Sequence, residues 1–451
     1  MKVNEHLVMK VSRPEVTFVI PSMIALATLS PYLIFFNENG LKINIVATVS
    51  VKSFLQTYYH ESFLQNVIIE DLTDYRRRYR LRGLCHKILL IIFTPRNYSV
   101  YYDLRLKNAL GYISRTNLFK YFNGLTSIKG NKVSDRVSFI MRFLFKNPFR
   151  TPFVITSTVV GASYLMSSRK LKVITILESW DHPIKIPKGY LSELVLVWNE
   201  DLARDWLLYQ DNSKIRFAYP VKLGYVIERG KTASVNLVDV NQKLNWLYPA
   251  TFSSFSRSIY YQEELQIVKQ IADFVFSRGD KLILKCKPNT SMMDFIELED
   301  YKGITIIRDD SSSYGSGDYF LSDEYNQKRL DILDKSDILI NLGTTFAFEG
   351  ALIGLPIVQF DLDKTSESPL YRIYEEYHLK QYFVDDCEKI FHVENIGNIK
   401  FSLNRAVNEL ESLGYNSRPY LMREKLFSFI SSRVSLEESF NAIINVLERQ
   451  D

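Results

Sequence analysis

The chain has 451 residues, more than one ordinary hydrophobic core accommodates, so two domains are expected. With 46% hydrophobic and 24% charged residues, its composition is that of a globular protein and argues against a largely disordered chain. The net charge of +5 is too small to indicate a nucleic-acid partner, and none is expected.

Three cysteines, Cys85, Cys286 and Cys387, are widely spaced and form no metal or disulfide pattern. This usage fits a reducing cytoplasm, and no secretory signal is expected at the N-terminus. The apolar run from Val16 to Phe36 approaches the length of a transmembrane helix, but prolines and serines interrupt it. A strand followed by a turn and a buried helix explains this run better, so a cytoplasmic protein is expected.

The first part of the chain alternates predicted strands with helices. Strands are predicted over residues 16–20, 43–49, 153–157, 172–177, 193–198 and 214–218, with helices through about 36, to about 168 and over 200–209. Between about residues 53 and 147 the pattern is mostly helical, aromatic-rich and basic, which predicts a helical insert. Residues 219–242 show weak periodicity and are predicted to be a linker. Such alternation favours a parallel sheet covered on both faces.

The second part repeats this scheme. Strands are predicted over residues 244–249, 281–286, 304–307, 338–340 and 357–360, and helices over 261–277 and 324–335. The tail from about 399 to 450 is predicted to be helical, with Ser435 as an N-cap ahead of Glu437 and Glu438. We therefore expect an N-terminal domain over residues 1–225 and a C-terminal domain over 243–451. In two doubly wound domains, ligands bind at the carboxyl ends of the strands.

One strand-to-helix turn has the composition of an anion site. Gly343, Thr344 and Thr345 follow a buried strand, and Glu349 comes one helical turn later. A glycine allows close approach of the backbone, while hydroxyls and a helix N-terminus can hold a phosphate. The carboxylate of Glu349 would then be within reach of a ribose hydroxyl, which together describes a nucleotide. The alternative is that Thr345 only caps a helix and that Glu349 is solvated.

This segment resembles the donor-site turn of GT-B glycosyltransferases and of the related non-hydrolysing UDP-N-acetylglucosamine 2-epimerases. In those proteins a helix carrying glutamate precedes a Gly-x-Pro-Val strand, which is GLPIV here, residues 354–358. Upstream, the sequence LILKCKPN, residues 282–289, resembles their Arg-x-His-Pro strand end. Lys285 and Lys287 stand in place of the arginine and the histidine, and Pro288 is kept.

A second pair of segments, ITILESWDHPIK and ELVLVWNEDLARDWLLY, resembles a signature of bacterial surface-polysaccharide glycosyltransferases of this fold. The matching residues are Ser179, Trp180, Asp181, Val197, Trp198, Asn199 and Glu200, whereas His182 replaces the usual asparagine. The resemblance implies a GT-B fold, with two Rossmann-like doubly wound domains facing across a cleft. It also implies sugar transfer from a nucleotide sugar to a glycan or lipid-linked glycan of the capsule or lipopolysaccharide.

An inverting transfer needs a base that deprotonates the acceptor hydroxyl. Asp181 is predicted to follow a buried strand of the N-terminal domain, and Trp180 beside it could raise its pKa by desolvation. His182 is the competing base because its pKa is nearest neutrality. The alternative is that Ser179, Trp180 and Asp181 form a structural turn or bind the acceptor.

Further donor-site candidates follow two other strands of the C-terminal domain. Lys287 could bind the leaving phosphate, with an exposed structural lysine as the alternative. Ser253 and Ser254 could form a second phosphate turn, although serine-rich loops are common. No Asp-x-Asp metal site is expected ahead of a strand, and no cofactor other than a UDP- or CMP-linked sugar substrate. The CMP option rests on resemblance to bacterial sialyl- and Kdo-transferases.

The segment YRRRYRLR contains five arginines, Arg76, Arg77, Arg78, Arg80 and Arg82. It could contact an anionic acceptor or the inner face of the cytoplasmic membrane, or it could be a solvated helix face. Two other functions remain open at this point. One is a sugar-nucleotide 2-epimerase of the same fold, and the other is a catalytically degenerate GT-B subunit that binds glycans or serves as a scaffold.

Overall fold

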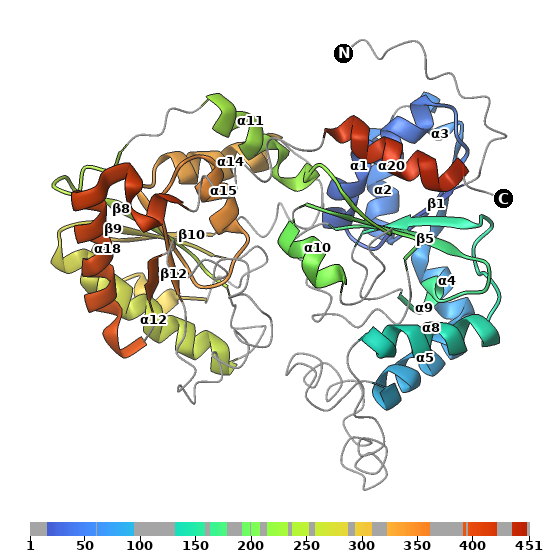
Figure 1. The fold of residues 1–451 in the computed structure, drawn as a ribbon, viewed down its shortest axis with the longest axis horizontal. Helices are drawn as coiled ribbons and strands as arrows, with labels where there is room; N and C mark the ends of the chain where they lie inside the picture. The colour runs from blue at the N-terminus through green and yellow to red at the C-terminus, as the bar shows by residue number, and fades with distance from the viewer. Residues whose placement is uncertain are drawn as a thin grey trace, which may run out of the picture. The chain divides into compact units, whose positions relative to one another are not determined.

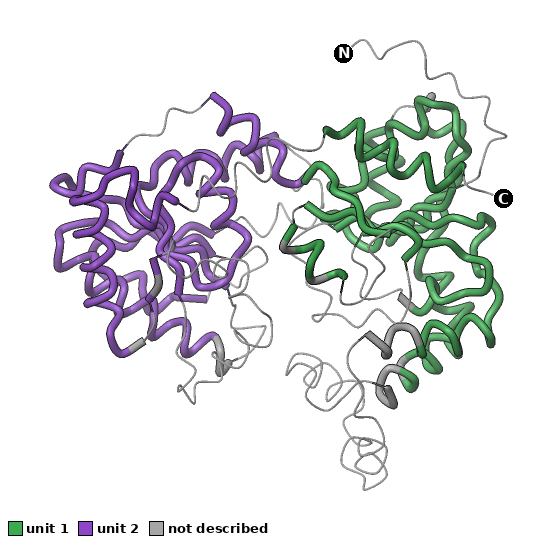
Figure 2. Tube along the Cα trace, in the orientation of Figure 1, with its two compact units in different colours: residues 1–96, 117–221, 434–451 green, residues 97–116, 222–433 purple. Residues whose placement is uncertain are grey.

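The computed structural model describes fourteen stretches of the chain, and all structural statements below concern them. They are residues 16–59, 61–93, 131–157, 163–177, 192–198, 200–207, 214–232, 237–251, 258–286, 294–308, 323–360, 391–393, 396–421 and 435–448. These residues divide into two compact units (Figure 2). The first contains the described residues up to 221 together with the last helix, and the second contains those from 222 to 421.

The first unit is built on seven parallel strands in the order β3-β2-β1-β4-β5-β6-β7. Their bounds are β1 (Val16–Ile20), β2 (Ile43–Ala47), β3 (Val67–Asp71), β4 (Phe153–Thr156), β5 (Lys172–Ile176), β6 (Leu194–Val197) and β7 (Ile215–Phe217). The central strand β1 pairs Val16 with Ile43 of β2 and with Phe153 of β4. All five residues of β1 are buried, as expected for a strand with helices on both faces.

The first sheet is covered on both faces (Figure 1). The helices of this unit are α1 (Met23–Glu38), α2 (Val49–Tyr58), α3 (Glu61–Leu64), α4 (Leu72–Arg78), α5 (Arg80–Phe93), α8 (Asn131–Leu144), α9 (Ser163–Met166), α10 (Glu200–Leu207) and α20 (Leu436–Glu448). Helix α1 begins after Ser22, whose side chain accepts a hydrogen bond from the N–H of Ala25. It ends at Asn39 and Gly40, whose φ of 72° favours glycine.

The predicted helical insert over residues 53–147 needs one correction. Helices α4, α5 and α8 lie in it, but so does the strand β3, which pairs with β2 along its full length. Residues of β3 are only half-buried, because the strand lies at the edge of the sheet. The apolar signal of this edge strand is weak, because only Val67, Ile68 and Ile69 are apolar and Glu70 and Asp71 follow them.

The boundary of the C-terminal domain was predicted wrongly at its end. Helix α20 belongs to the first unit, although it comes last in the chain (Figure 2). Its Phe440 stacks on Phe35 of α1 with ring centroids 4.0 Å apart and meets Tyr32 edge-on at 5.2 Å. The predicted cap is confirmed: Ser435 Oγ accepts from the N–H of Glu438, and the Glu438 carboxylate accepts from the N–H of Ser435.

The second unit holds six parallel strands in the order β10-β9-β8-β11-β12-β13. Their bounds are β8 (Asn245–Pro249), β9 (Lys281–Lys285), β10 (Ile304–Ile307), β11 (Ile338–Asn341), β12 (Ile357–Phe360) and β13 (Phe391–Val393). The first five agree with the prediction, whereas β13 was not predicted. It is an edge strand of three residues, too short to give a periodic pattern.

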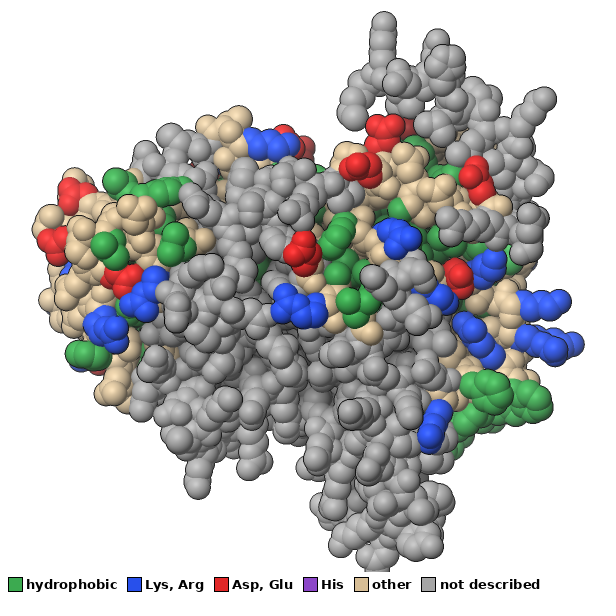
Figure 3. Space-filling view, in the orientation of Figure 1, with side chains coloured by type: hydrophobic (Ala, Val, Ile, Leu, Met, Phe, Trp, Pro, Cys, Tyr) green, Lys and Arg blue, Asp and Glu red, His purple; other side chains and the backbone are tan. Residues whose placement is uncertain are grey.

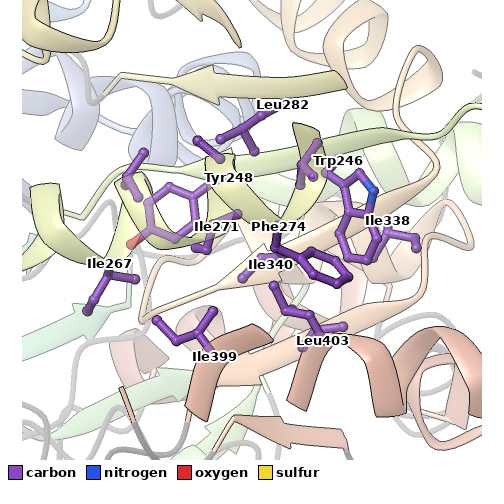
Figure 4. Packing of buried hydrophobic residues seen from close by; sticks show 14 of the residues in the cluster. Trp246, Tyr248, Ile267, Ile271, Phe274, Leu282, Ile338, Ile340, Ile399 and Leu403 are labelled. Carbon is purple, nitrogen blue, oxygen red and sulfur yellow. The ribbon is translucent and has the colours of Figure 1, made fainter. Parts of the chain in front are cut away.

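The helices of the second unit cover both faces of its sheet. They are the 3₁₀ turn η4 (Val221–Leu223), α11 (Gly224–Thr232), α12 (Ser258–Ser277), η5 (Ile296–Leu298), α14 (Asp323–Asp334), α15 (Phe346–Leu352), η7 (Ile396–Asn398), α18 (Ile399–Leu413) and η8 (Gly414–Asn416). The turn η4 and helix α11 lie within residues 219–242, so residues 221–232 are helical and not part of the linker that the sequence predicted. Helices α12 and α18 cover one face, and Figure 4 shows Trp246, Tyr248 and Phe274 in the core beneath them.

Apart from the additional edge strand β7 of the first sheet, both sheets have the same strand order, which is the order of Rossmann-type doubly wound sheets. In each, the chain begins at an inner strand, builds two strands to one side and then returns to build the other side. The predicted fold class of two Rossmann-like α/β domains is therefore confirmed. The order reverses between β1 and β4 in the first sheet and between β8 and β11 in the second, and these are the switch points where ligands bind.

Candidate nucleotide site

The predicted anion turn lies at the switch point of the second sheet. Gly343, Thr344 and Thr345 follow β11, which pairs directly with β8. Strands β8 and β11 are the two strands between which the order reverses. Because all the strands are parallel, their carboxyl ends lie at one edge of the sheet. This edge is the place where a doubly wound fold binds its ligand.

Two buried amides brace this turn. Asn341 and Gln359 are register partners on β11 and β12, and Asn341 Nδ2 donates to Gln359 Oε1 at 2.7 Å. Asn341 Oδ1 then accepts from both the N–H and the hydroxyl of Thr344, at 2.9 and 3.1 Å. The donors of Thr344 are therefore used inside the protein, although its oxygen can still accept. This arrangement fixes the backbone of the turn before any ligand binds.

Thr345 is half-buried and carries the second hydroxyl of the turn. It has helical dihedral angles ahead of α15, and its side chain makes no capping hydrogen bond. The interpretation of Thr345 as a helix cap is therefore wrong. Within the described part of the chain, its hydroxyl has no hydrogen-bond partner. Thr345 remains the predicted donor to a phosphate.

Glu349 is buried rather than solvated, with only 4% of its side chain exposed. Arg329 of α14 forms a bidentate ion pair with it, in which Nη2 donates to Oε1 and Nε donates to Oε2. Tyr225 of α11 donates its hydroxyl to Oε2 and accepts from Arg329 Nε at 2.9 Å. Arg329 also lies over the ring of Phe346, 4.4 Å from its centroid. Three helices thus meet at this carboxylate.

The Glu349 carboxylate raises the pKa values of both Tyr225 and Arg329 in this buried cluster. Burial raises the pKa of Tyr225 well above its ordinary value, and the nearby Glu349 carboxylate raises it further against the opposing effect of Arg329. Burial works to lower the pKa of Arg329, but Glu349 raises it, and the net direction is upward. Tyr225 therefore stays a neutral donor and Arg329 stays charged. Contact of Glu349 with a ribose hydroxyl remains a prediction, since both of its oxygens already accept from protein groups.

The other strand of the switch point, β8, is followed by Ala250 and Thr251. The N–H of Thr251 donates to Oε1 of Glu264 at 2.7 Å, and Tyr248 donates its hydroxyl to the same oxygen at 3.1 Å. Glu264 comes from α12 and is fully buried. The hydroxyl oxygen of Thr251 is itself buried and has no hydrogen-bond partner among the described residues. A buried hydroxyl left unpaired is costly, which makes it a candidate for bonding to a ligand.

Strand β9 brings a cation towards the same edge. Lys285 is buried at its carboxyl end, and its ammonium donates to the carbonyl oxygen of Cys286 at 3.1 Å. Burial raises the pKa of the Cys286 thiol to about 12, although Arg308 and Lys285 oppose the shift. The thiol is therefore protonated at neutral pH and is not a candidate nucleophile.

Five of the predicted site residues lie outside the described residues. They are Asp181, His182, Ser253, Ser254 and Lys287. Their roles remain predictions. The segments that contain Ser253 and Lys287 follow β8 and β9, whose carboxyl ends lie at the same edge as the turn after β11.

The first sheet has a related feature at its own switch point. Ser157 follows β4, and its hydroxyl oxygen is buried without a hydrogen-bond partner among the described residues. Thr156 beside it is satisfied, because its hydroxyl donates to the carbonyl oxygen of Val19. A buried hydroxyl without a partner among the described residues therefore lies at the carboxyl edge of each sheet.

The arginine run does not act as one surface, and one member of the prediction is wrong. Arg82 is buried, and its guanidinium donates to backbone carbonyl groups, those of Lys146, Tyr164, Leu165 and Ser167. Burial lowers its pKa to about 10. It joins α5 to the end of α9 and cannot contact a membrane. Arg77, Arg78 and Arg80 are exposed.

Within the described ranges, no group of three or more histidine, cysteine, aspartate or glutamate side chains is placed to hold a metal ion. The prediction of a metal-independent reaction is not tested by this. Among the helices that the structure describes, none is long and apolar enough to cross a membrane.

No family model matches the chain, and no curated protein matches it. Among solved structures, the chain is similar to a UDP-GlcNAc 2-epimerase from Methanocaldococcus jannaschii in complex with UDP-GlcNAc and UDP. The identity is 12% and the TM-score 0.49, over 96% of this chain and 99% of that one. It is also similar to UGT89C1 from Arabidopsis thaliana complexed with UDP, with 11% identity and a TM-score of 0.48, over 96% and 100% of the two chains.

A glycosyltransferase from Rickettsia africae is similar as well, with 10% identity and a TM-score of 0.42, over 98% of this chain and 100% of that one. These are the kinds of protein that the sequence resemblance names. TM-scores below 0.5 place no constraint on reaction or substrate. The assignment of the fold rests on the two sheets described above.

Several residues of this site escaped the sequence analysis. Asn341 and Gln359 could have been recognised from the sequence, since each is a polar residue inside an otherwise apolar buried strand. Arg329 could not be recognised, because it lies in a helix rich in charged residues. Tyr225 was missed because α11 was taken for a linker.

Proposed function

We propose that the protein is a glycosyltransferase that moves a sugar from a nucleotide-sugar donor to a glycan or lipid-linked glycan acceptor. The observation that carries this proposal is the braced hydroxyl turn, Gly343 to Thr345, at the switch point of the second sheet. A phosphate held there needs no lysine or metal from the turn itself. The motifs around Asp181 and Trp198, which resemble surface-polysaccharide glycosyltransferases, favour transfer over other uses of a nucleotide sugar.

In this proposal the second unit holds the donor. Thr345 donates to a phosphate oxygen, Lys287 stabilises the leaving nucleotide, and Ser253 and Ser254 bind at the neighbouring turn. Glu349 keeps the turn in place through Arg329 and faces the ribose side of the nucleotide. A donor linked to UDP is favoured over one linked to CMP, since Lys287 replaces the histidine of CMP-dependent relatives of this fold.

The first unit supplies the acceptor site and the base. Asp181 deprotonates the acceptor hydroxyl as it attacks the anomeric carbon, and the sugar–phosphate bond breaks with inversion. The electron pair of that bond leaves with the nucleotide, and the proton stays on the carboxyl group until it exchanges with water. His182 is the competing base. The acceptor proposed is a bacterial capsule or lipopolysaccharide glycan, made at the inner face of the cytoplasmic membrane.

The first test of this proposal is donor turnover by an Asp181→Asn variant. Nucleotide affinity should be nearly unchanged, while single-turnover rate with saturating donor should fall by about 10²–10⁴-fold, the usual contribution of a positioned base. His182→Ala serves as the matched control and should cost less. A larger rate loss in His182→Ala than in Asp181→Asn would make His182 the base. Parental rates in both variants would show that neither residue is the base.

Product analysis separates the proposal from a 2-epimerase. Incubation with UDP-N-acetylglucosamine and no acceptor should leave the sugar configuration unchanged by NMR. Appearance of the 2-epimer would contradict the assignment to sugar transfer. Binding of a glycan without any donor turnover would instead indicate a degenerate subunit.

A further inference from the structure

The helical insert of the first unit exposes large apolar side chains on two neighbouring helices, α5 and α8. On α5, Leu81, Leu84 and Ile88 are 77%, 53% and 44% exposed. Their spacing of three and then four residues places them on one face of the helix. On α8, Phe139 and Phe143 are 72% and 81% exposed and lie one turn apart. With Leu144, these six residues are called the apolar face below.

The apolar face is not a core surface that has lost its partner. Both helices bury a different set of residues against the rest of the unit. Val137 and Met141 of α8 are fully buried, and Arg82 and His86 of α5 are buried as well. The exposed apolar residues of each helix are therefore distinct from the residues with which it packs against the unit. Apolar surface gathered in this way on a folded protein marks an interaction site.

Exposed arginines border the apolar face. Arg77 and Arg78 end α4, Arg80 begins α5 beside Leu81, and Arg136 lies one turn before Phe139. Helix α5 contains no aspartate or glutamate. Figure 3 shows the result at the lower right of the view, where hydrophobic side chains gather below a group of Lys and Arg side chains.

We propose that the apolar face rests in a membrane surface that contains anionic lipids. The phenylalanine and leucine side chains would enter the boundary between headgroups and acyl chains, and the bordering arginines would bind lipid phosphates. A second copy of the chain fits less well, because a symmetric contact would bring the same arginines against each other. This inference does not depend on the proposed glycosyltransferase activity. Of the predicted membrane contact it keeps Arg77, Arg78 and Arg80, omits Arg76 and Arg82, and adds Arg136.

The test is binding of the full chain to vesicles in a co-sedimentation assay. The parent protein should bind vesicles of equal parts phosphatidylcholine and phosphatidylglycerol, and bind phosphatidylcholine alone much more weakly. Phe139→Ser with Phe143→Ser should weaken binding at least about tenfold, because two inserted rings are lost. Phe276→Ser with Phe401→Ser is the matched control: these two rings are 55% and 63% exposed on the second unit, and their loss should change nothing.

A second variant keeps the test independent of the phenylalanines. Arg77→Gln with Arg80→Gln should weaken binding by about fivefold per arginine, and added salt should reduce the difference. Absence of parental binding to the anionic vesicles would overturn the proposal. So would unchanged binding by both variants, or a parental dimer that the phenylalanine variant dissociates, since the apolar face would then bind a second copy.

Discussion

Glu349 was predicted to contact a ribose hydroxyl, and in the folded protein it forms a buried ion pair with Arg329. The sequence offers a carboxylate one turn after a hydroxyl turn, which suits a ribose. The structure adds Arg329 and Tyr225, which could not be predicted from it, because α14 carries many charges and α11 has weak periodicity. The carboxylate is thereby held in one position behind the turn. A ligand contact from it would be made by a group that is already oriented.

Removal of Arg329 should leave the carboxylate of Glu349 buried and without its ion-pair partner. Arg329→Ala should therefore lower the free energy of unfolding of the second unit by about 3–5 kcal/mol. Native-state hydrogen exchange in β11 and β12 measures this locally. The matched control is Lys328→Ala on the same helix, whose ion pair with Glu324 is exposed and should contribute less than about 1 kcal/mol. Equal effects of the two changes would show that the cluster is not what holds the turn.

At the scale of elements, α15 is placed by close packing on β11. Gly350 lies in the middle of this short helix, and a Cβ built there would come within 2.7 Å of Leu339 Cδ1. Leu339 is fully buried, and Ile357 and Leu355 lie close on the other sides. The glycine thus allows the helix, and with it the turn before it, to approach the sheet.

Gly350→Ala should destabilise the second unit, although alanine is the better helix former. The added methyl group overpacks the contact with Leu339, at a cost of about 1–3 kcal/mol. Leu339→Val in the same chain removes the opposing methyl group and should recover part of the loss. Hydrogen exchange in α15 measures both effects. A stability gain from Gly350→Ala alone would contradict the close-packing explanation.

Elements were predicted well where burial on both faces gave apolar runs, as in β1, β8 and β11. They were predicted badly at the sheet edges, since β3 ends in two acidic residues and is not fully buried, and β13 has only three residues. For the site, the turn and its position after β11 were predictable from local residue types. The partners of Glu349 and Thr344 were not, because they come from other elements that only the tertiary fold brings together.

For the whole molecule, the end of the chain belongs to the unit that its beginning forms. Sequence order placed α20 with the second domain, but Phe440 packs between Tyr32 and Phe35 of α1. No local pattern in α20 reveals which apolar surface will cover it. The chain therefore leaves the first unit near residue 221 and returns to it ahead of α20.

Phe440→Ala should weaken the first unit alone. Loss of a nearly buried phenylalanine side chain costs about 3–5 kcal/mol. Amides of β1 and β6 should exchange faster by hydrogen exchange, whereas amides of β8 and β11 should keep their parental rates. The matched control is Phe401→Ala, which is 63% exposed on α18 and should change neither set. Faster exchange confined to the second unit would contradict the assignment of α20.

The central claim is that a nucleotide binds at the turn after β11, and titration calorimetry of Thr345→Val tests it most directly. UDP should bind the parent, and the variant should bind about 5- to 150-fold more weakly, which corresponds to about 1–3 kcal/mol for a lost hydrogen bond to a charged group. Thr305→Val, the same change at an exposed position of edge strand β10, is the control and should bind like the parent. Equal affinity of the Thr345 variant and the parent for UDP, or for CMP where CMP binds instead, would contradict the claim.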